Sequence, residues 1–492
     1  MTTPFLNYIN GRWSQPKSGA WFERENPATG ETIGSFPASG PEDVADAVEA
    51  AANAWERWRD TPAPRRAEVL FRAAELMVAR KQELGRDVTI EMGKVLKEGL
   101  GDVQEAIDMT YYAAGEGRRM FGQTTPSELP EKFCMAVRQP HGVVAAITPW
   151  NFPLAIPCWK LMPALVTGNT VVFKPSSFSP LSAHNLLSIL EEAGLPPGVA
   201  NLVFGQQGTG EALVRDPRVR MVSFTGSVEA GRDVGTHCAQ TGKRVHLEMS
   251  GKNAIIVLDD ADLDLALDGT VWSAFGTSGQ RCTAASRIIV QDAVTASLTD
   301  RLVAAARSLR LGNGLDPETE MGPVVNGPQL EKIEQYMEIG RNEGASVAAG
   351  GARAGGALER GHFFQPTVFV DVRPAMRVAQ EEIFGPVTDI IRCASLDEAI
   401  AINNDVPYGL VTSIYTRDVS KAFRAIERIT TGIVYVNAGT IGAEVHLPFG
   451  GTRGTGNGHR EAGQAALDSY TEWKSVYVDY SGRLQKAQID VE

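Results

Sequence analysis

The feature that most constrains the fold is an alternation of short, β-rich apolar runs with helical stretches along the middle of the chain. The β-rich runs cover residues 143–147, 170–173, 200–204, 221–224 and 254–258, and the helical stretches between them include 179–193 and 228–238. This alternation is typical of βαβ units that build a parallel sheet. Such sheets bind ligands beyond the carboxyl ends of their strands, so the loops after these runs are the first place to look for function.

The flanking regions have different patterns. The first ~120 residues read mostly as helix, and Ser39-Gly40-Pro41-Glu42 resembles a capping box that starts one. Pro62 ends that helix, and further helical spacing follows around 69–77 and 104–112. Residues 124–140 contain prolines without helical periodicity, which predicts an inserted ribbon. A second α/β region spans about 263–466, and residues 475–480 read as a strand. The glycines from Gly205 to Gly210 are interpreted as a turn.

Bulk properties exclude several classes of function. A length of 492 residues predicts two or three domains. The net charge of −12 argues against nucleic acid or an anionic membrane as the main partner. We expect no transmembrane helix, because no apolar run approaches ~18 residues, and no secretory signal. The five cysteines are scattered and have no metal-ligand spacing. We therefore expect no disulfide framework, no metal and a reducing, cytoplasmic location.

Three residues stand out for chemistry. Cys282 lies in Ser278-Gly279-Gln280-Arg281-Cys282-Thr283, where small residues allow a ligand close to the backbone. Asn151 is held between Pro149 and Pro153, as an amide that stabilises an oxyanion would need to be. Glu248 ends a strand-like run, where a carboxylate is either paired or tuned as a base. Taken singly, each is more often structural: a packed cysteine, a turn asparagine or an ion-paired glutamate.

Two further segments suit a dinucleotide. Gly226 and Ser227 follow a predicted strand and open a helix, which is a favourable place for a pyrophosphate. The spacing to Gly231 is not the usual G-x-G-x-x-G fingerprint, so this motif is only suggestive. Lys174 stands at the carboxyl end of another strand, where a cofactor would rest.

In combination, these segments closely resemble the aldehyde dehydrogenase superfamily, the NAD(P)-dependent, non-phosphorylating enzymes. The resemblance runs in the correct order from about Tyr8 to Val478, and seven motifs in order reverse the structural readings of the single residues. The motifs are Pro149-Trp150-Asn151-Phe152-Pro153, Lys174-Pro175, Phe224-Thr225-Gly226-Ser227, Glu248, Gly279-Gln280-Arg281-Cys282, Glu381-Glu382-Ile383-Phe384-Gly385-Pro386 and Pro448-Phe449-Gly450-Gly451.

The resemblance implies a mechanism. Cys282 attacks the aldehyde carbon, the Asn151 amide and the Cys282 backbone N–H hold the oxyanion, and a thioester remains after hydride transfer. Glu248 then activates the water that releases the acid. The cofactor would be bound by Trp150, Lys174, Ser177, Gly226, Ser227, Glu382 and Phe384. Lys160 and Glu461 match a pair associated with proton exit, although an ordinary ion pair is an adequate explanation. Trp150 and Phe449 would line the aldehyde tunnel.

Two departures from the family pattern matter. NAD-preferring relatives usually carry a glutamate three residues after the lysine, and this chain has Ser177 there. A carboxylate would repel a 2′-phosphate, whereas serine donates to it, so we predict that NADP is accepted and leave its preference over NAD open. After Glu248 the family commonly has Leu-Gly-Gly, and this chain has Met249-Ser250-Gly251, which could stiffen the loop that carries the base.

The substrate is less well determined. The loop from Ala438 to His446 occupies the substrate-anchoring region, and Arg281 adjoins the nucleophile. Arg118 and Arg119 follow a helix that borders the tunnel in the family. A cationic tunnel mouth would suit an ω-carboxylated semialdehyde. Parts of the chain also resemble bacterial α-ketoglutaric semialdehyde dehydrogenases, notably Tyr111-Tyr112-Ala113 and residues 280–286. Solvated surface arginines are the alternative reading.

Other classes of function fit less well. A structural or binding member of the family would tend to lose the nucleophile or the base, and both are present here. A CoA-acylating dehydrogenase usually dispenses with the glutamate at position 248. A cysteine hydrolase needs a base for its thiol, and none of the seven histidines lies in such a motif.

The resemblance also implies an architecture. We expect an α/β protein with a Rossmann-like cofactor domain (1–122 and 141–250) and an α/β catalytic domain (251–472). A β-ribbon oligomerisation arm (123–140 and 473–492) would complete it. Such an arm exposes strand edges that a partner subunit must cover, so a homodimer or homotetramer is expected.

Overall fold

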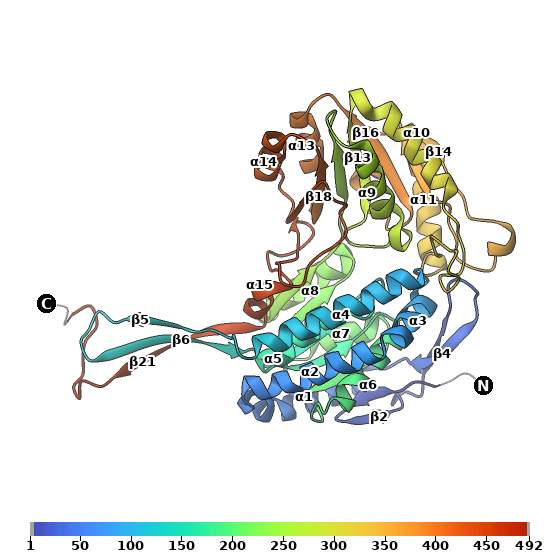
Figure 1. Cartoon of the computed structure of the whole chain (residues 1–492). Helices are drawn as coiled ribbons and strands as arrows, with labels where there is room; N and C mark the ends of the chain where they lie inside the picture. Colours follow the sequence, from blue (N-terminus) through green and yellow to red (C-terminus); the bar gives the residue numbers. More distant parts are fainter. Residues whose placement is uncertain (1–3, 490–492) are drawn as a thin grey trace.

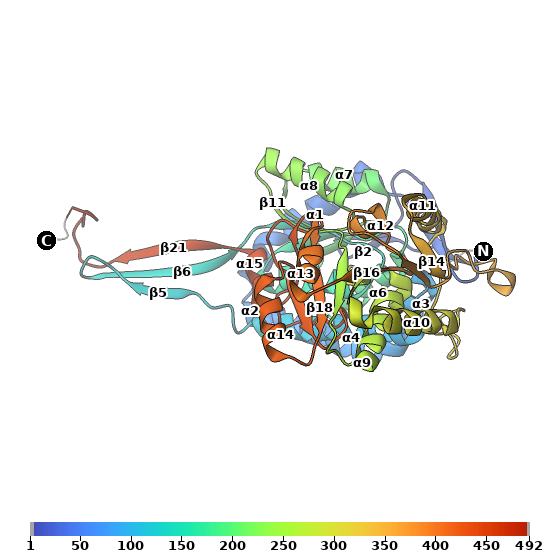
Figure 2. The same ribbon diagram turned by 90° about the horizontal axis from the view of Figure 1, so that it is seen from above.

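The computed structural model describes residues 4–489. It contains two seven-stranded sheets with helices packed against them, and a three-stranded ribbon that projects from the body (Figures 1 and 2). The prediction of an α/β fold is confirmed.

The first sheet has the strand order β11-β10-β7-β8-β9-β1-β2. The five strands from β11 to β9 are parallel, and β1 and β2 add an antiparallel edge. Every residue of β7 and β8 is buried, as expected for parallel strands covered on both faces. The strands are β1 (Asn7–Ile9), β2 (Arg12–Ser14), β7 (Val143–Ile147), β8 (Thr170–Lys174), β9 (Ala200–Leu202), β10 (Val219–Thr225) and β11 (Arg244–Glu248).

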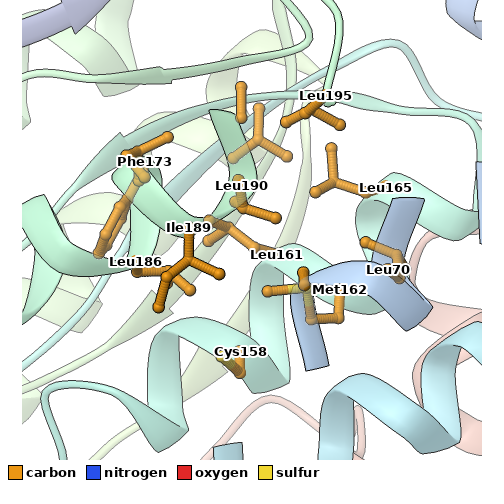
Figure 3. Packing of buried hydrophobic residues seen from close by; sticks show 14 of the residues in the cluster. Leu70, Cys158, Leu161, Met162, Leu165, Phe173, Leu186, Ile189, Leu190 and Leu195 are labelled. Carbon is orange, nitrogen blue, oxygen red and sulfur yellow. The ribbon is translucent and has the colours of Figure 1, made fainter. Parts of the chain in front are cut away.

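Helices cover both faces of this sheet. Leu70, Cys158, Leu161, Leu190 and Phe173 meet in the larger core, where α2, α4, α5 and α6 pack on one face (Figure 3). A second core joins α1, α7 and α8 to the other face. The helices are α1 (Pro41–Asp60), α2 (Ala63–Ala79), α3 (Lys81–Met92), α4 (Leu96–Glu116), α5 (Ala155–Thr167), α6 (Pro180–Glu192), α7 (Gln207–Arg215) and α8 (Val228–Thr241).

The second sheet follows directly, because only residues 249–252 separate β11 from the first strand of this sheet. Its order is β14-β15-β16-β13-β12-β18-β19, and only β14 is antiparallel to its neighbour. The strands are β12 (Asn253–Val257), β13 (Ala285–Gln291), β14 (Ser346–Ala349), β15 (Thr367–Val370), β16 (Val387–Cys393), β18 (Val411–Tyr415) and β19 (Ile433–Val436). The helices are α9 (Leu263–Phe275), α10 (Asp292–Ser308), α11 (Gly327–Glu343), α12 (Arg377–Gln380), α13 (Leu396–Asn404) and α14 (Val419–Arg428), with 3-10 turns η1 (Gly276–Gly279) and η2 (Gly356–Leu358).

The projecting ribbon pairs two segments that lie far apart in sequence. Strand β6 (Lys132–Pro140) pairs with β5 (Gln123–Pro126) on one side and β21 (Thr471–Asp479) on the other, all antiparallel. The predicted ribbon and terminal strand are therefore one sheet (Figure 2). The remaining elements are the hairpin β3 (Trp21–Glu25) and β4 (Thr32–Pro37), the pair β17 (Tyr408–Gly409) and β20 (Thr452–Arg453), and α15 (Gly463–Ser469).

Three local predictions need correction. Helix α1 starts at Pro41, and the Asp43 carboxylate accepts from the Gly40 N–H at 3.1 Å, so Ser39 and Glu42 do not form the box. The Ser39 hydroxyl instead accepts from Asn7. Gly208 and Gly210 lie inside α7, not in a turn. The first 40 residues contain β1–β4 rather than helix, because short strands leave little periodic signal. Within residues 4–489, no helix is long and apolar enough to cross a membrane.

Candidate active site

Cys282 sits on a tight turn at the end of α9. Thr277, Ser278 and Gly279 have φ values of 53°, 55° and 67°, so the chain reverses within a few residues. A Cβ on Gly279 would lie 2.0 Å from the Gly385 carbonyl oxygen, so only glycine permits this approach. The Asn253 amide donates to the Cys282 carbonyl at 2.7 Å and fixes the backbone of the cysteine.

Cys282 opens into a cavity of about 280 Å³ that is lined by residues from both halves of the chain. Glu248, from the last position of β11, lines the same cavity. A thiol and a carboxyl that face one small space can act on one substrate in turn. The other lining residues are Lys97, Glu98, Gly101, Asp102, Glu105, Phe152, Ile156, Trp159, Thr225, Trp272, Arg281, Thr283, Ile441, Gly442, Ala443, Phe449 and Glu461.

The surroundings of Cys282 favour the thiol over the thiolate. Burial raises the pKa of Cys282 well above 9.0, and the nearby carboxylates Glu248 and Glu105 raise it further. A positive charge brought in by a ligand would favour the thiolate and so activate the sulfur.

Glu248 is almost fully buried, and its Oε1 has no hydrogen-bond partner among residues 4–489. Burial raises the pKa of Glu248 well above 4.5, and the carboxylate of Glu461 raises it further, whereas Lys160 lowers it. The Gly451 backbone N–H also donates to it. A carboxyl with a raised pKa is suited to accept a proton near neutral pH.

Lys160 and Glu461 form a buried ion pair behind this base. The Lys160 Nζ lies 2.5 Å from Glu461 Oε1, and both side chains are almost fully buried. The Nζ also donates to the Ser223 hydroxyl at 3.2 Å. Glu461 raises the pKa of Glu248 and Lys160 lowers it, so the three side chains interact electrostatically.

Asn151 is buried, and its amide has no hydrogen-bond partner within the described residues. The following residue, Phe152, lines the cavity and lies 3.8 Å from the Lys94 ammonium. On the opposite wall, Phe449 packs edge-on against Trp159, with ring centroids 5.0 Å apart. Asn151 thus stands beside the cavity wall with its polar group unused.

A second, larger cavity of about 740 Å³ lies along the carboxyl end of the first sheet. Lys174 and Ser227 line it, and Ser227 caps α8 through a hydrogen bond to Ala230 N. Burial lowers the pKa of Lys174 to about 8, and its ammonium has no acceptor in the part of the chain that the structure describes. A buried, unpaired cation in an elongated groove fits a nucleotide cofactor, which would satisfy it.

Not every predicted cofactor residue lines this groove. Gly226 precedes Ser227 and donates its N–H to the Glu248 carbonyl at 3.1 Å. Ser177 is half-buried and lies outside the groove lining. Trp150 packs edge-on against Phe384, with centroids 5.4 Å apart, so these two rings form one patch.

Glu382 connects this patch to the loop that carries the base. Its carboxylate accepts from the Gly251 N–H at 2.9 Å and from the Ser250 side chain. Burial raises the pKa of Glu382, and these two hydrogen bonds lower it. Ser250, which departs from the family pattern, therefore has a hydrogen-bond partner in Glu382.

The predicted substrate residues fall into two groups. Arg281 lines the cavity, but its guanidinium donates to the buried Glu98 carboxylate at 3.2 Å. His446 lies outside the lining and pairs at the surface with Glu444 at 3.3 Å. Arg118 and Arg119 lie outside it too; Arg118 lines a separate pocket near the base of the ribbon, and Arg119 pairs with Glu116.

Sequence reasoning missed Lys97, Gly101 and Glu105, which recur every four residues along α4 and line one wall. The i, i+4 spacing was the available signal, but it shows only that the residues share a face. No group of side chains suited to hold a metal occurs among residues 4–489.

Comparison with known proteins agrees with this arrangement. The aldehyde dehydrogenase family model matches residues 13–476. An alpha-ketoglutarate semialdehyde dehydrogenase of Haloferax volcanii is 43% identical over 98% of this chain and 100% of its own length. An alpha-ketoglutaric semialdehyde dehydrogenase of Bacillus subtilis is 40% identical over 96% of this chain and 98% of its own.

A crystal structure of betaine aldehyde dehydrogenase from Staphylococcus aureus in complex with NAD+ superposes with a TM-score of 0.95. It is 34% identical and covers 97% of this chain and 95% of its own. The chain therefore belongs to the aldehyde dehydrogenase family, as an NAD(P)-dependent oxidoreductase that converts an aldehyde to a carboxylic acid.

Proposed function

We propose that this enzyme oxidises an ω-carboxylated semialdehyde through a thioester on Cys282 and that Glu248 directs the hydrolysis. The observation that carries the chemistry is that these two side chains face one cavity of about 280 Å³. Both curated relatives described above are named for such a semialdehyde, which supports the substrate class.

In the first half-reaction, the Cys282 thiol loses its proton to solvent, and the resulting thiolate adds to the aldehyde carbon. The unpaired amide of Asn151 and the Cys282 backbone N–H would hold the oxyanion that forms. Bound NAD(P)+ supplies the hydride acceptor and a positive charge. Because the Cys282 thiol is surrounded by carboxylates, that charge would also favour the thiolate.

In the second half-reaction, Glu248 takes a proton from the water that attacks the thioester carbon. The product leaves as its carboxylate, its acid proton returns Cys282 to the thiol, and one proton remains on Glu248. The raised pKa of Glu248 suits this role, because a stronger base forms when the carboxylate is ionised. We propose that Ser250 holds this loop against Glu382 and so positions the base without taking part in the chemistry.

For the cofactor, we propose that Lys174 and Ser227 hold the adenosine and pyrophosphate side, and Glu382, Phe384 and Trp150 the nicotinamide side. Gly226 and Ser177 complete the set. NADP is accepted in this proposal, because Ser177 removes the carboxylate that would repel a 2′-phosphate. The groove also contains Glu211, Glu229 and Asp233, so the ratio of NADP to NAD use depends on which of these faces the phosphate.

For the substrate, we propose that Lys97 receives the distal carboxylate. Of the two cations at the outer part of the cavity, Arg281 is paired with Glu98, whereas Lys97 has no partner among residues 4–489. Gly101, one turn further along α4, has open space where a Cβ would stand, which leaves room for the chain of the substrate. His446 and Arg281 would then shape the mouth rather than bind the carboxylate directly.

The test is reduced-nucleotide absorbance with neutral and ω-carboxylated aldehydes of equal length, with NAD and with NADP, alongside Cys282→Ala. We expect turnover that disappears in the variant and a higher kcat/KM for the carboxylated aldehydes. A preference for the neutral aldehydes would contradict the substrate class but not the chemistry. Binding of nucleotide without turnover of any aldehyde would contradict both.

We also propose that the ribbon assembles the enzyme into a homodimer or homotetramer. Strands β21 and β5 are both edges of the ribbon (Figure 1), and Phe133, Trp473 and Tyr477 are exposed residues of its strands. Exposed edges with large apolar side chains are normally covered by a partner. The described cysteines are all free, which supports the cytoplasm as the compartment.

The same reasoning supports the three domains. Residues 1–122 and 141–250 would form the cofactor domain, because every strand of the first sheet falls within these ranges. Residues 251–472 would form the catalytic domain around the second sheet, and residues 123–140 and 473–492 the arm.

A further inference from the structure

His246 is a buried histidine that the chemistry described above leaves unused. It lies two residues before Glu248 on β11, so both side chains leave the strand on the same face. Only 1% of its surface is exposed, and neither ring nitrogen has a hydrogen-bond partner among residues 4–489. Buried imidazole nitrogens are normally bonded to protein or to ordered water, so two unbonded nitrogens call for an explanation.

On its inner side, His246 adjoins the buried ion pair. In the register of β10 and β11, His246 stands opposite Ser223, and Glu248 opposite Thr225. Neighbouring strands are about 4.8 Å apart, so the imidazole lies beside the Ser223 side chain. The Ser223 hydroxyl accepts from Lys160 Nζ at 3.2 Å, and Lys160 pairs with Glu461. The ring is therefore one side chain away from the Lys160–Glu461 pair.

On its outer side, His246 faces His459, a residue exposed to solvent. The two ring centroids are 5.6 Å apart, with planes inclined by 59°. His459 lies two residues before Glu461, so the same short segment contributes to the buried pair and to the surface. One water molecule is enough to connect rings at this separation.

We propose that His246 and His459 carry the proton released during thioester hydrolysis from the Lys160–Glu461 pair to solvent. This inference rests on the proposed function, because it needs Glu248 to collect that proton. The attacking water loses one proton to the Glu248 carboxylate, and the proton passes on through Glu461, Lys160 and the Ser223 hydroxyl. His246 accepts it at one ring nitrogen and releases another from the opposite nitrogen to His459, which transfers it to bulk water. Each group then returns to its starting state, and one proton leaves.

The electrostatics favour a neutral His246 ring at rest. Burial lowers the pKa of His246 well below 6.5, and the positive charges of Lys160, His459 and Arg460 lower it further. The neutral imidazole has one donor and one acceptor nitrogen, so it can pass a proton without retaining it.

The experiment compares His246→Gln, His459→Gln and the control His141→Gln in the full-length enzyme. His141 is a nearby, partly buried histidine whose ring bonds the Ser469 carbonyl, away from Lys160. Stopped-flow absorbance separates a burst of reduced nucleotide, which reports hydride transfer, from the steady state, which reports hydrolysis. Thermal unfolding confirms that each variant is folded.

We expect His246→Gln to keep the rate of the burst and to lower the steady-state rate at least about tenfold, with a larger solvent deuterium isotope effect. We expect His459→Gln to lose less and to regain wild-type turnover as imidazole buffer is raised, because a mobile base replaces a surface relay. Imidazole should not restore turnover in His246→Gln, because this position is buried. The control should behave as wild type.

Wild-type hydrolysis in both folded variants, or a loss in His459→Gln that imidazole does not restore, would overturn the relay. Failure of the wild-type enzyme to reduce nucleotide with any aldehyde would instead overturn the proposed function, so the two failures are distinguishable.

Discussion

The guanidinium of Arg281, one residue before the nucleophile, donates to the buried Glu98 carboxylate at 3.2 Å. Its Nε also donates to the Thr277 hydroxyl at 2.8 Å, and its charge lies 4.8 Å from the Trp272 ring. The arginine is thus held on three sides. Its position beside Cys282 serves the geometry of the turn, and its charge is already neutralised.

The pairing of Arg281 with Glu98 gives Lys97 and Arg281, the two cations that line the cavity, different expected roles. We expect Lys97→Gln to raise KM for an ω-carboxylated aldehyde about fivefold, the effect of one exposed charge pair, and to leave a neutral aldehyde of equal length unchanged. We expect Arg281→Gln to impair both aldehydes to the same degree, because it leaves Glu98 without its partner. Steady-state kinetics with the two aldehydes checks this. If Arg281→Gln impaired only the carboxylated aldehyde, Arg281 and not Lys97 would be the residue that binds the carboxylate.

The cofactor proposal depends on a residue three positions after Lys174. We expect Ser177→Glu to raise KM for NADP at least about tenfold, because a carboxylate would repel the 2′-phosphate in a poorly screened site. The KM for NAD should fall or stay constant, since glutamate can accept from ribose hydroxyls. Ser177→Gln is the neutral control and should have little effect on either. If the KM values for NADP and NAD changed equally, the 2′-phosphate would not lie near residue 177.

The sequence predicted the features that depend on residues close together in the chain. The alternation between residues 143 and 258 predicted the parallel sheet, because fully buried strands such as β7 and β8 are continuous apolar runs. The motifs around Cys282 and Glu248 predicted that these two residues act at one site. The size of the cavity that they share could not be predicted from the sequence.

Charge pairing could not be predicted in the same way. Arg281 and Glu98 are 183 positions apart, and Lys160 and Glu461 are 301 apart. Sequence showed Arg281 beside the nucleophile but not that it is paired with Glu98, and it did not identify Lys97 as a residue of the site. His246 was likewise invisible as a candidate, because its position beside Ser223 depends on strand register.

The pH dependence of hydrolysis should follow Glu248. The base acts only when ionised, and its pKa is raised above 4.5, so the hydrolysis rate should rise with pH above the ordinary range of a carboxyl group. Below that pKa, the protonated form should let the thioester accumulate. Glu248→Gln should keep the burst of reduced nucleotide and lose the steady state by about 100-fold or more. A rise centred near pH 4.5 would contradict the effect of burial.

The surroundings of Cys282 predict its reactivity without a ligand. Because its pKa is raised above 9.0, the thiol should react slowly with iodoacetamide at pH 7, and faster with each increase in pH up to 9. Added NAD+ should accelerate the reaction at pH 7 by bringing a positive charge near the sulfur. Mass spectrometry of the modified peptide checks this, with buried Cys158 as the internal control. A rate independent of pH between 7 and 9 would show that the thiolate is already formed.

The second sheet contains a buried pair that supports the loop after Glu248. Lys252 Nζ lies 3.5 Å from Asp389 Oδ2, and both side chains are fully buried. Removing one charge from such a pair leaves the other uncompensated, so Asp389→Ala should lower the free energy of unfolding by about 3–5 kcal/mol. Glu334→Gln breaks the exposed pair with Arg353 and should cost at most about 1 kcal/mol. Denaturant unfolding of both variants checks the difference. Equal, small losses would show that Lys252 is neutral in the folded enzyme, which would agree with the lowering of its pKa by burial.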